Sequence, residues 1–369
     1  MEEKIKELSK TLINYSLSIK NGERVLIKTE SIDTKPLIKE LVKEITSVGG
    51  IPVVRYIDIE TNDLLVSNTT QNRIELLKKM NEFDVENFDA FISIHYIEND
   101  YNGKNIDKKI IGAIGEALKE SNDIRINERK WVLLNYPSIT AAYKAGMPTE
   151  EFYKYSFDVM TVDYAKMHEL IKPLKELMEK TKKVRIVAPN TDITFSIEGM
   201  PAIPCCGNFN IPDGEIYTAP IKDNVNGVIT YNTPCPYQGN VYHNVSLTFE
   251  NGKIVKATCD EDNEALNQIF DIDEGARYVG EFAIGLNPKI LHPMGDILFD
   301  EKIIGSIHFT PGRAYQDAFN GNISSIHWDM VLIERLEYGG GSLYFDDVLI
   351  RENGKFVIPE LEPLNYNLK

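Results

Sequence analysis

The first half of the chain alternates short apolar runs with helical patterns, and this alternation restricts the fold more than any other feature. The apolar run at 25–27 follows an Asn-Gly turn and predicts a buried strand. A helix is expected from the Asp-Thr-Lys-Pro segment at 33–36 to the glycine pair at 49–50, because early proline and terminal glycine are typical of helix ends. Residues 51–57 form the next expected strand. Such a βαβ unit predicts a parallel sheet.

A change of pattern near residue 182 predicts a second domain. Before it, strands are expected at 91–94 and 131–134, and helices at 110–119 and 149–180. After it, strand-like runs are separated by Pro, Gly, Asn and Asp, and the run at 241–249 precedes an Asn-Gly hairpin signal. A chain of 369 residues is also long for a single core. We therefore predict an α/β N-terminal domain with a parallel sheet (1–181), followed by a β-rich α+β catalytic domain (182–369).

The charge balance of the chain disfavours several classes of partner. Lys and Arg total 40 against 56 Asp and Glu, which gives a net charge of -16. An acidic surface repels phosphate groups, so we expect no nucleic-acid partner and no anionic membrane partner. The sequence has no long apolar stretch and its start lacks the pattern of a signal peptide. We therefore expect a cytoplasmic location, and we interpret the four cysteines as reduced thiols.

Several common catalytic motifs are missing from the sequence. It contains no GxxxxGK[ST] phosphate loop, no GxGxxG after the first strand, no GxSxG elbow and no HExxH helix. Without a phosphate-binding loop, the N-terminal α/β domain lacks the feature that dinucleotide binding requires. The chemistry is therefore expected elsewhere in the chain.

Two of the six histidines stand in settings that favour a site. His327 and Asp329 lie in the run 325–333, which we expect to be a strand, so that both side chains project from one face. Imidazole nitrogen with carboxylate oxygen suits Zn²⁺, Co²⁺ or Mn²⁺. A buried His hydrogen-bonded to Asp gives the same pattern. His308 ends an apolar run before a Gly- and Pro-containing loop, which suits either a site rim or an ordinary loop. The other four are interpreted as structural or surface residues: His95, His168, His243 and His292.

Two glutamates stand in apolar or turn-rich surroundings. Glu281 is flanked by Val, Phe, Ala and Ile within residues 279–284, and Glu215 follows a Pro-Asp-Gly turn. A buried carboxylate is costly unless a partner neutralises it. A metal ion would be such a partner, and so would an Arg or Lys.

These segments together resemble a known group of enzymes. The chain is similar over most of its length to the thermophilic aminopeptidases, the aminopeptidase T and aminopeptidase S group of metallopeptidases. The resemblance is firmest in four segments that occur in the same order, at 210–220, 280–288, 307–315 and 327–329.

The resemblance implies roles for individual residues. Glu215 and His308 would bind one divalent ion, His327 and Asp329 a second, and Glu281 would bridge the two. Tyr315 would donate a hydrogen bond to the transition state. The resemblance also implies a homodimer that releases N-terminal residues from peptides with a free N-terminus.

A mechanism follows as an expectation from this ligand set. Two divalent ions, Zn, Co or Mn, would activate a water molecule that attacks the first peptide bond. The general base would be a carboxylate, Glu215 or Glu281. Two alternatives stay open: a peptide- or metal-binding protein without catalysis on the same fold, and a two-metal amidase that acts on non-peptide amides.

Overall fold

The computed structural model describes residues 1–366, which form two compact units. The first comprises residues 1–161 and 207–212, and the second comprises residues 162–206 and 213–366. The expected domain boundary at 181/182 lies at the end of helix α8 (Tyr164–Lys180), which belongs to the second unit. The division into domains at 181/182 stays a prediction.

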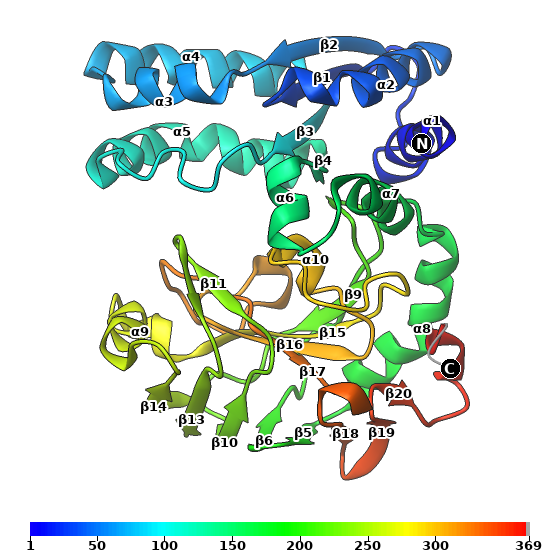
Figure 1. The fold of residues 1–369 in the computed structure, drawn as a ribbon, viewed down its shortest axis with the longest axis vertical. Helices are drawn as coiled ribbons and strands as arrows, with labels where there is room; N and C mark the ends of the chain where they lie inside the picture. Colours follow the sequence, from blue (N-terminus) through cyan, green and yellow to red (C-terminus); the bar gives the residue numbers. More distant parts are fainter. Residues whose placement is uncertain (367–369) are drawn as a thin grey trace. The chain divides into compact units, whose positions relative to one another are not determined.

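The first unit is built on a five-stranded parallel sheet (Figure 1). Its strand order is β2-β1-β3-β4-β8, and every neighbouring pair is parallel. The strands are β1 (Arg24–Thr29), β2 (Ile51–Tyr56), β3 (Ala90–Tyr96), β4 (Lys130–Tyr136) and β8 (Asn210–Ile211). The helices are α1 (Glu2–Lys10), α2 (Lys35–Ser47), α3 (Ile59–Ser67), α4 (Gln71–Asn87), α5 (Lys108–Glu128), α6 (Ile139–Lys144) and α7 (Thr149–Met160). The predicted parallel α/β architecture is confirmed.

The second unit contains two larger antiparallel sheets. One has the order β14-β13-β10-β6-β5-β18-β19-β20 and the other the order β17-β16-β15-β9-β7. The first comprises β5 (Lys183–Ala188), β6 (Thr191–Ser196), β10 (Val225–Thr230), β13 (Ser246–Glu250), β14 (Lys253–Thr258), β18 (Ser342–Phe345), β19 (Val348–Glu352) and β20 (Lys355–Phe356). The second comprises β7 (Ile203–Cys205), β9 (Glu215–Thr218), β15 (Val279–Gly285), β16 (Ser306–Pro311) and β17 (Val331–Ile333). A separate pair is β11 (Cys235–Tyr237) with β12 (Asn240–Tyr242), and the helices include α8, α9 (Asn263–Phe270) and α10 (Ile297–Asp300).

Aromatic side chains fill the core between these two sheets. Phe195 on β6 meets Phe282 on β15 and Phe309 on β16, with ring centroids 5.0 and 4.9 Å apart. Because side chains alternate along a strand, the residues next to these phenylalanines project from the opposite face of the five-stranded sheet. That face carries Glu281 on β15 and His308 on β16.

The expected strand at 325–333 is shorter than predicted. Only β17 (Val331–Ile333) is a strand, and His327 makes a single isolated bridge to Gly312. Gly312 has φ +109°, and a Cβ there would lie 2.2 Å from the carbonyl oxygen of Ile326. The close approach of these two loop segments replaces the regular ladder that the alternating pattern predicted.

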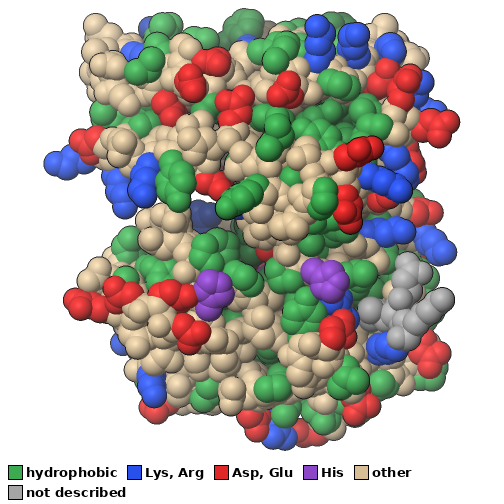
Figure 2. Space-filling model, viewed as in Figure 1, with side chains coloured by type: hydrophobic (Ala, Val, Ile, Leu, Met, Phe, Trp, Pro, Cys, Tyr) green, Lys and Arg blue, Asp and Glu red, His purple; other side chains and the backbone are tan. Residues whose placement is uncertain are grey.

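The surface in Figure 2 carries acidic and basic side chains interspersed with hydrophobic ones. None of the helices within residues 1–366 is both long and apolar enough to cross a membrane. All four cysteines are free thiols, as the sequence predicted.

Candidate metal centre

The register of the five-stranded sheet brings the predicted ligands to one face. Ala283 on β15 pairs with His308 on β16, and Gly285 pairs with Glu215 on β9. Glu281 lies two residues before Ala283 and therefore on the same face. β16 also pairs His308 with Val331, so the segment before β17 continues this face towards Asp329.

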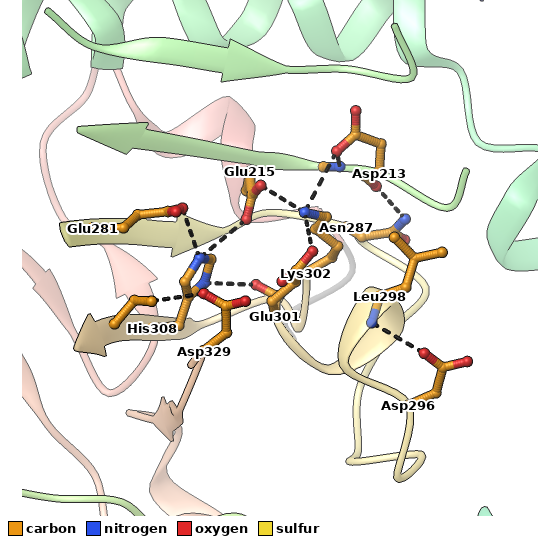
Figure 3. Close-up of polar contacts among 12 residues, drawn as sticks. Asp213, Glu215, Glu281, Asn287, Asp296, Leu298, Glu301, Lys302, His308 and Asp329 are labelled. Atoms are coloured by element: carbon orange, nitrogen blue, oxygen red, sulfur yellow. Dashed lines mark hydrogen bonds and ion pairs between the residues drawn. The ribbon is translucent and has the colours of Figure 1, made fainter. Parts of the chain in front are cut away.

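The five predicted ligands converge in two groups that share Glu281. Ligand atoms of Glu215, Glu281 and His308 lie within 4.8 Å of one another, and so do those of Glu281, His327 and Asp329. Nε2 of His308 lies 3.1 Å from Oε1 of Glu281, and Nε2 of His327 lies 3.3 Å from its Oε2. Each carboxylate oxygen of Glu281 thus faces one histidine (Figure 3 draws the His308 side).

Both histidines are oriented by backbone carbonyl groups. Nδ1 of His308 lies 3.2 Å from the carbonyl oxygen of Glu301, and Nδ1 of His327 lies 2.7 Å from that of Arg313. A carbonyl only accepts hydrogen bonds, so each Nδ1 carries the proton and donates it. In neutral rings, each Nε2 then presents a lone pair to carboxylate oxygens. Such a lone pair needs either a proton or a metal cation between it and the carboxylate.

Glu215, Glu281 and His308 are buried and the other two residues are partly buried, and the groups of the centre perturb each other's protonation. Burial acts to lower the pKa of His308, but Glu215 and Glu281 outweigh it and raise that pKa to about 9. Burial acts to raise the pKa of Asp329, yet His327 outweighs it and holds that pKa well below its usual range. The carboxylates therefore stabilise the protonated, positively charged forms of the histidines. A bound divalent ion would supply this positive charge instead of the protons.

The donor set fits divalent metal ions. Two imidazoles and three carboxylates suit Zn²⁺, Co²⁺ or Mn²⁺. Oε2 of Glu215 is buried and accepts no hydrogen bond from the residues that the structure describes, although it lies 3.4 Å from Nε2 of His308. A buried acceptor without a hydrogen-bond partner is costly, so this oxygen is suited to be a metal ligand.

Tyr315 stands at the edge of the centre. Its ring centroid lies 4.6 Å from that of His327 and 5.7 Å from that of Tyr217. The residue is 43% exposed, so that it can contact a molecule that binds from solvent.

The other histidines have partners outside the five predicted ligands or lie on the surface. His95 contacts Glu30, His243 contacts Glu261, His292 contacts Tyr338, and His168 is exposed on α8.

Four neighbours of the centre were missed by the sequence analysis. Thr310 donates a hydrogen bond of 2.7 Å to Oδ1 of Asp329. Lys302 is buried and contacts Glu215 and Glu301, each at 2.6 Å, and Asp213 at 3.8 Å. Burial raises the pKa of Glu301 to about 8 against the opposing effect of Lys302. A signal existed for two of them, because consecutive charged residues at 300–302 interrupt an otherwise apolar segment.

The donor set of this centre suits a metal-dependent hydrolase, and comparison with known proteins gives the family. The sequence matches the thermophilic metalloprotease family (M29) over residues 1–356. The chain therefore belongs to this family. The predicted resemblance is confirmed, and with it the prediction of a metallo-aminopeptidase that depends on divalent metal.

Individual relatives agree with this placement. Aminopeptidase AmpS of Bacillus subtilis is 26% identical, with 86% of this chain and 85% of the relative covered. Aminopeptidase PepS of Streptococcus thermophilus is 24% identical, with 97% and 98% covered. The structure of wild-type AmpT from Thermus thermophilus matches with a TM-score of 0.80 at 21% identity, covering 97% of this chain and 100% of that one. The last match confirms the predicted fold class.

Proposed function

We propose that the chain is a two-metal aminopeptidase that hydrolyses the N-terminal bond of peptides with a free N-terminus. The observation that carries the proposal is the pair of carbonyl-oriented histidines whose Nε2 atoms face the two oxygens of Glu281. Such an arrangement would accommodate one cation on each side of the Glu281 carboxylate. Glu215 and His308 would hold one ion, and His327 and Asp329 the other.

The residues around the centre have separable roles in this reaction. When bound, a pair of divalent ions supplies an activated water molecule and polarises the scissile carbonyl group. Glu281 or Glu215 accepts the proton of the attacking water. The hydroxyl of Tyr315 donates a hydrogen bond to the developing oxyanion, which lowers the barrier by a few kcal/mol when the donor is well placed. Carbonyl groups hold both imidazoles in position and so keep the site organised before substrate arrives.

Chelation tests the metal dependence of this activity. Removal of metal should abolish cleavage of an aminoacyl-amide, and Co²⁺, Zn²⁺ or Mn²⁺ should restore it. Unchanged cleavage by protein shown to be metal-free would contradict the mechanism. The ion that restores most activity would identify the preferred metal, because mixed nitrogen and oxygen ligands accept several.

The alternatives predict different outcomes in matched assays. A two-metal amidase would cleave N-acetylated aminoacyl-amides as well as the unblocked ones, whereas an aminopeptidase needs the free amine. A binding protein would hold metal or peptide but would show no turnover with any of the three ions.

We also propose that the chain assembles as a homodimer, supported by apolar side chains exposed on the first unit. Leu76, Met80 and Phe83 on α4 are 57%, 47% and 58% exposed and share one helical face. Met80 and Phe83 line a shallow depression beside Arg55 of the edge strand β2. Exposed apolar residues grouped in this way mark interaction surfaces. The cytoplasmic location stays a prediction.

A further inference from the structure

Lys302 is a buried cation that the proposed mechanism does not use. Its side chain is 1% exposed, and Nζ lies 2.6 Å from Oε1 of Glu215, 2.6 Å from Oε1 of Glu301 and 3.8 Å from Oδ1 of Asp213. Figure 3 shows Nζ between the carboxylates of Glu215 and Glu301. The ammonium group donates hydrogen bonds to Glu215 and Glu301, and Asp213 adds an ion pair at 3.8 Å, so that three carboxylates surround it. It is therefore placed to act through the carboxylates and not by contact with a substrate.

The contact with Lys302 gives the two carboxylate oxygens of Glu215 different partners. Oε1 takes the charge-assisted hydrogen bond, whereas the buried Oε2 lies 3.4 Å from Nε2 of His308. A carboxylate can bind a cation through one or both oxygens. With Oε1 engaged by an ammonium group, only Oε2 stays available on the His308 side.

On the opposite side of the centre, no lysine or arginine within residues 1–366 forms an ion pair with Asp329. Oδ1 of Asp329 accepts a hydrogen bond of 2.7 Å from the hydroxyl of Thr310, which is neutral. Glu281 lies between the two sides and contacts both histidines. A fixed positive charge therefore stands behind the Glu215 carboxylate and a neutral dipole behind the Asp329 carboxylate. A positive charge in a buried site repels a divalent cation strongly.

We propose that Lys302 makes the two ion sites unequal, so that the ion held by Glu215 and His308 is bound more weakly than the ion held by His327 and Asp329. Lys302 is a positioning residue in this scheme: it restricts Glu215 to one oxygen and withdraws negative charge from one site only. The inference rests on the proposed two-ion function and assigns the weaker, exchangeable ion within it.

Calorimetric titration of metal-free protein with Mn²⁺ tests the inference without an activity assay. Wild-type protein should show two classes of site whose dissociation constants differ by about tenfold or more. Glu215→Gln should remove the weaker class and keep the stronger one. Loss of the stronger class in Glu215→Gln would overturn the assignment, and this result does not depend on any change at Lys302.

Variants of Lys302 test its role directly. Lys302→Gln should tighten the weaker class by about tenfold or more and change the stronger class by less than about threefold, because the repelling charge is gone. Lys302→Arg keeps the charge, so both dissociation constants should stay close to those of the wild type. Lys175→Gln is the control for loss of a lysine, because Lys175 contacts Glu179 elsewhere in the second unit. Unaltered constants in a folded Lys302→Gln protein would overturn the role of Lys302 while leaving the two-ion proposal intact. Binding of a single ion by the wild type would instead contradict the two-ion proposal itself.

Discussion

Glu281 is the residue that the two halves of the proposed metal centre share. Its two carboxylate oxygens face different histidines, at 3.1 and 3.3 Å. It is buried, and although burial acts to raise its pKa, His308 and His327 outweigh that effect and lower it. In the proposed two-ion centre, a change at this position would disturb both sites at once.

The change Glu281→Gln should lower kcat/KM by about 10³-fold or more, because it removes the shared charge and one candidate base. Metal content should fall at both sites. Glu250→Gln, an exposed change on β13, is the matched control. A Glu281→Gln protein with wild-type activity and metal content would show that the bridging role is wrong.

Proton release should accompany metal binding, because the histidines carry protons in the metal-free centre. The pKa of His308 is raised to about 9 by Glu215 and Glu281 against the effect of burial, and that of His327 is also raised. With a pKa of about 9, the His308 ring is protonated at pH 7, and a ligating Nε2 must give up that proton. Titration with metal in buffers of different ionisation enthalpy should show proton release at pH 7, and the contribution of His308 should fall as the pH rises through 9. A release that does not change between pH 7 and 10 would contradict this account.

The sequence carried only part of the information about these residues. Periodicity placed His327 and Asp329 on one face, and their contact at 3.2 Å agrees with it. Glu215, Glu281 and His308 entered through the family resemblance. Lys302 was missed because its partners Asp213 and Glu215 lie almost ninety residues away in the sequence, and charge pattern alone does not report such a distance.

At the level of elements, the loop that carries His327 is anchored by a capping carboxylate. Asp273 precedes a short helix at Glu274–Arg277, accepts a hydrogen bond from the backbone N–H of Ala276, and also accepts hydrogen bonds from Ser324 and Ser325. Partial burial acts to raise its pKa, but the bonds from the two serines outweigh it and lower the pKa to about 2. This single side chain thus connects the start of one element to the segment that leads into the metal centre.

Asp273→Asn should destabilise the protein by about 1–2 kcal/mol at pH 7, because the charged acceptor is lost. Since the folded-state pKa is depressed, the contribution of Asp273 is present above pH 4 and disappears as the pH falls from 4 to 2. Denaturant unfolding at pH 7 and at pH 3 should therefore show a smaller difference between variant and wild type at the lower pH. An equal or larger difference at pH 3 would exclude this linkage.

Among the helices of the first unit, α2 has a buried apolar stripe and was predicted, whereas α3 and α4 lack one and were not predicted. Helix α2 buries Leu37, Ile38, Leu41 and Ile45, and its apolar spacing predicted it. Helix α3 buries no residue, and α4 buries only Asp84 and Val85, so neither presents a buried apolar stripe. The length of the strand expected at 325–333 was overestimated. The alternating segment forms a single isolated bridge at His327 and then a strand of three residues.

At the scale of the whole molecule, the exposed apolar face of α4 bears on assembly. The double variant Met80→Glu, Phe83→Glu should shift the protein from a dimer towards a monomer, because charges cannot be buried there without a partner. Light scattering after gel filtration should give about twice the chain mass of 41.9 kDa for the wild type and a lower mass for the variant. Val255→Glu, at a position 49% exposed in the second unit, is the control. A wild-type mass of one chain would contradict the dimer.

The central claim is that two ions serve one reaction, and titration of activity against bound metal tests it most directly. Metal-free protein should be loaded stepwise with Co²⁺, with metal per chain and cleavage of an unblocked aminoacyl-amide measured at each step. The account predicts that activity reaches its maximum when about two ions are bound per chain and that N-acetylated substrate stays uncleaved throughout. Full activity at one ion per chain, or in protein without metal, would contradict it.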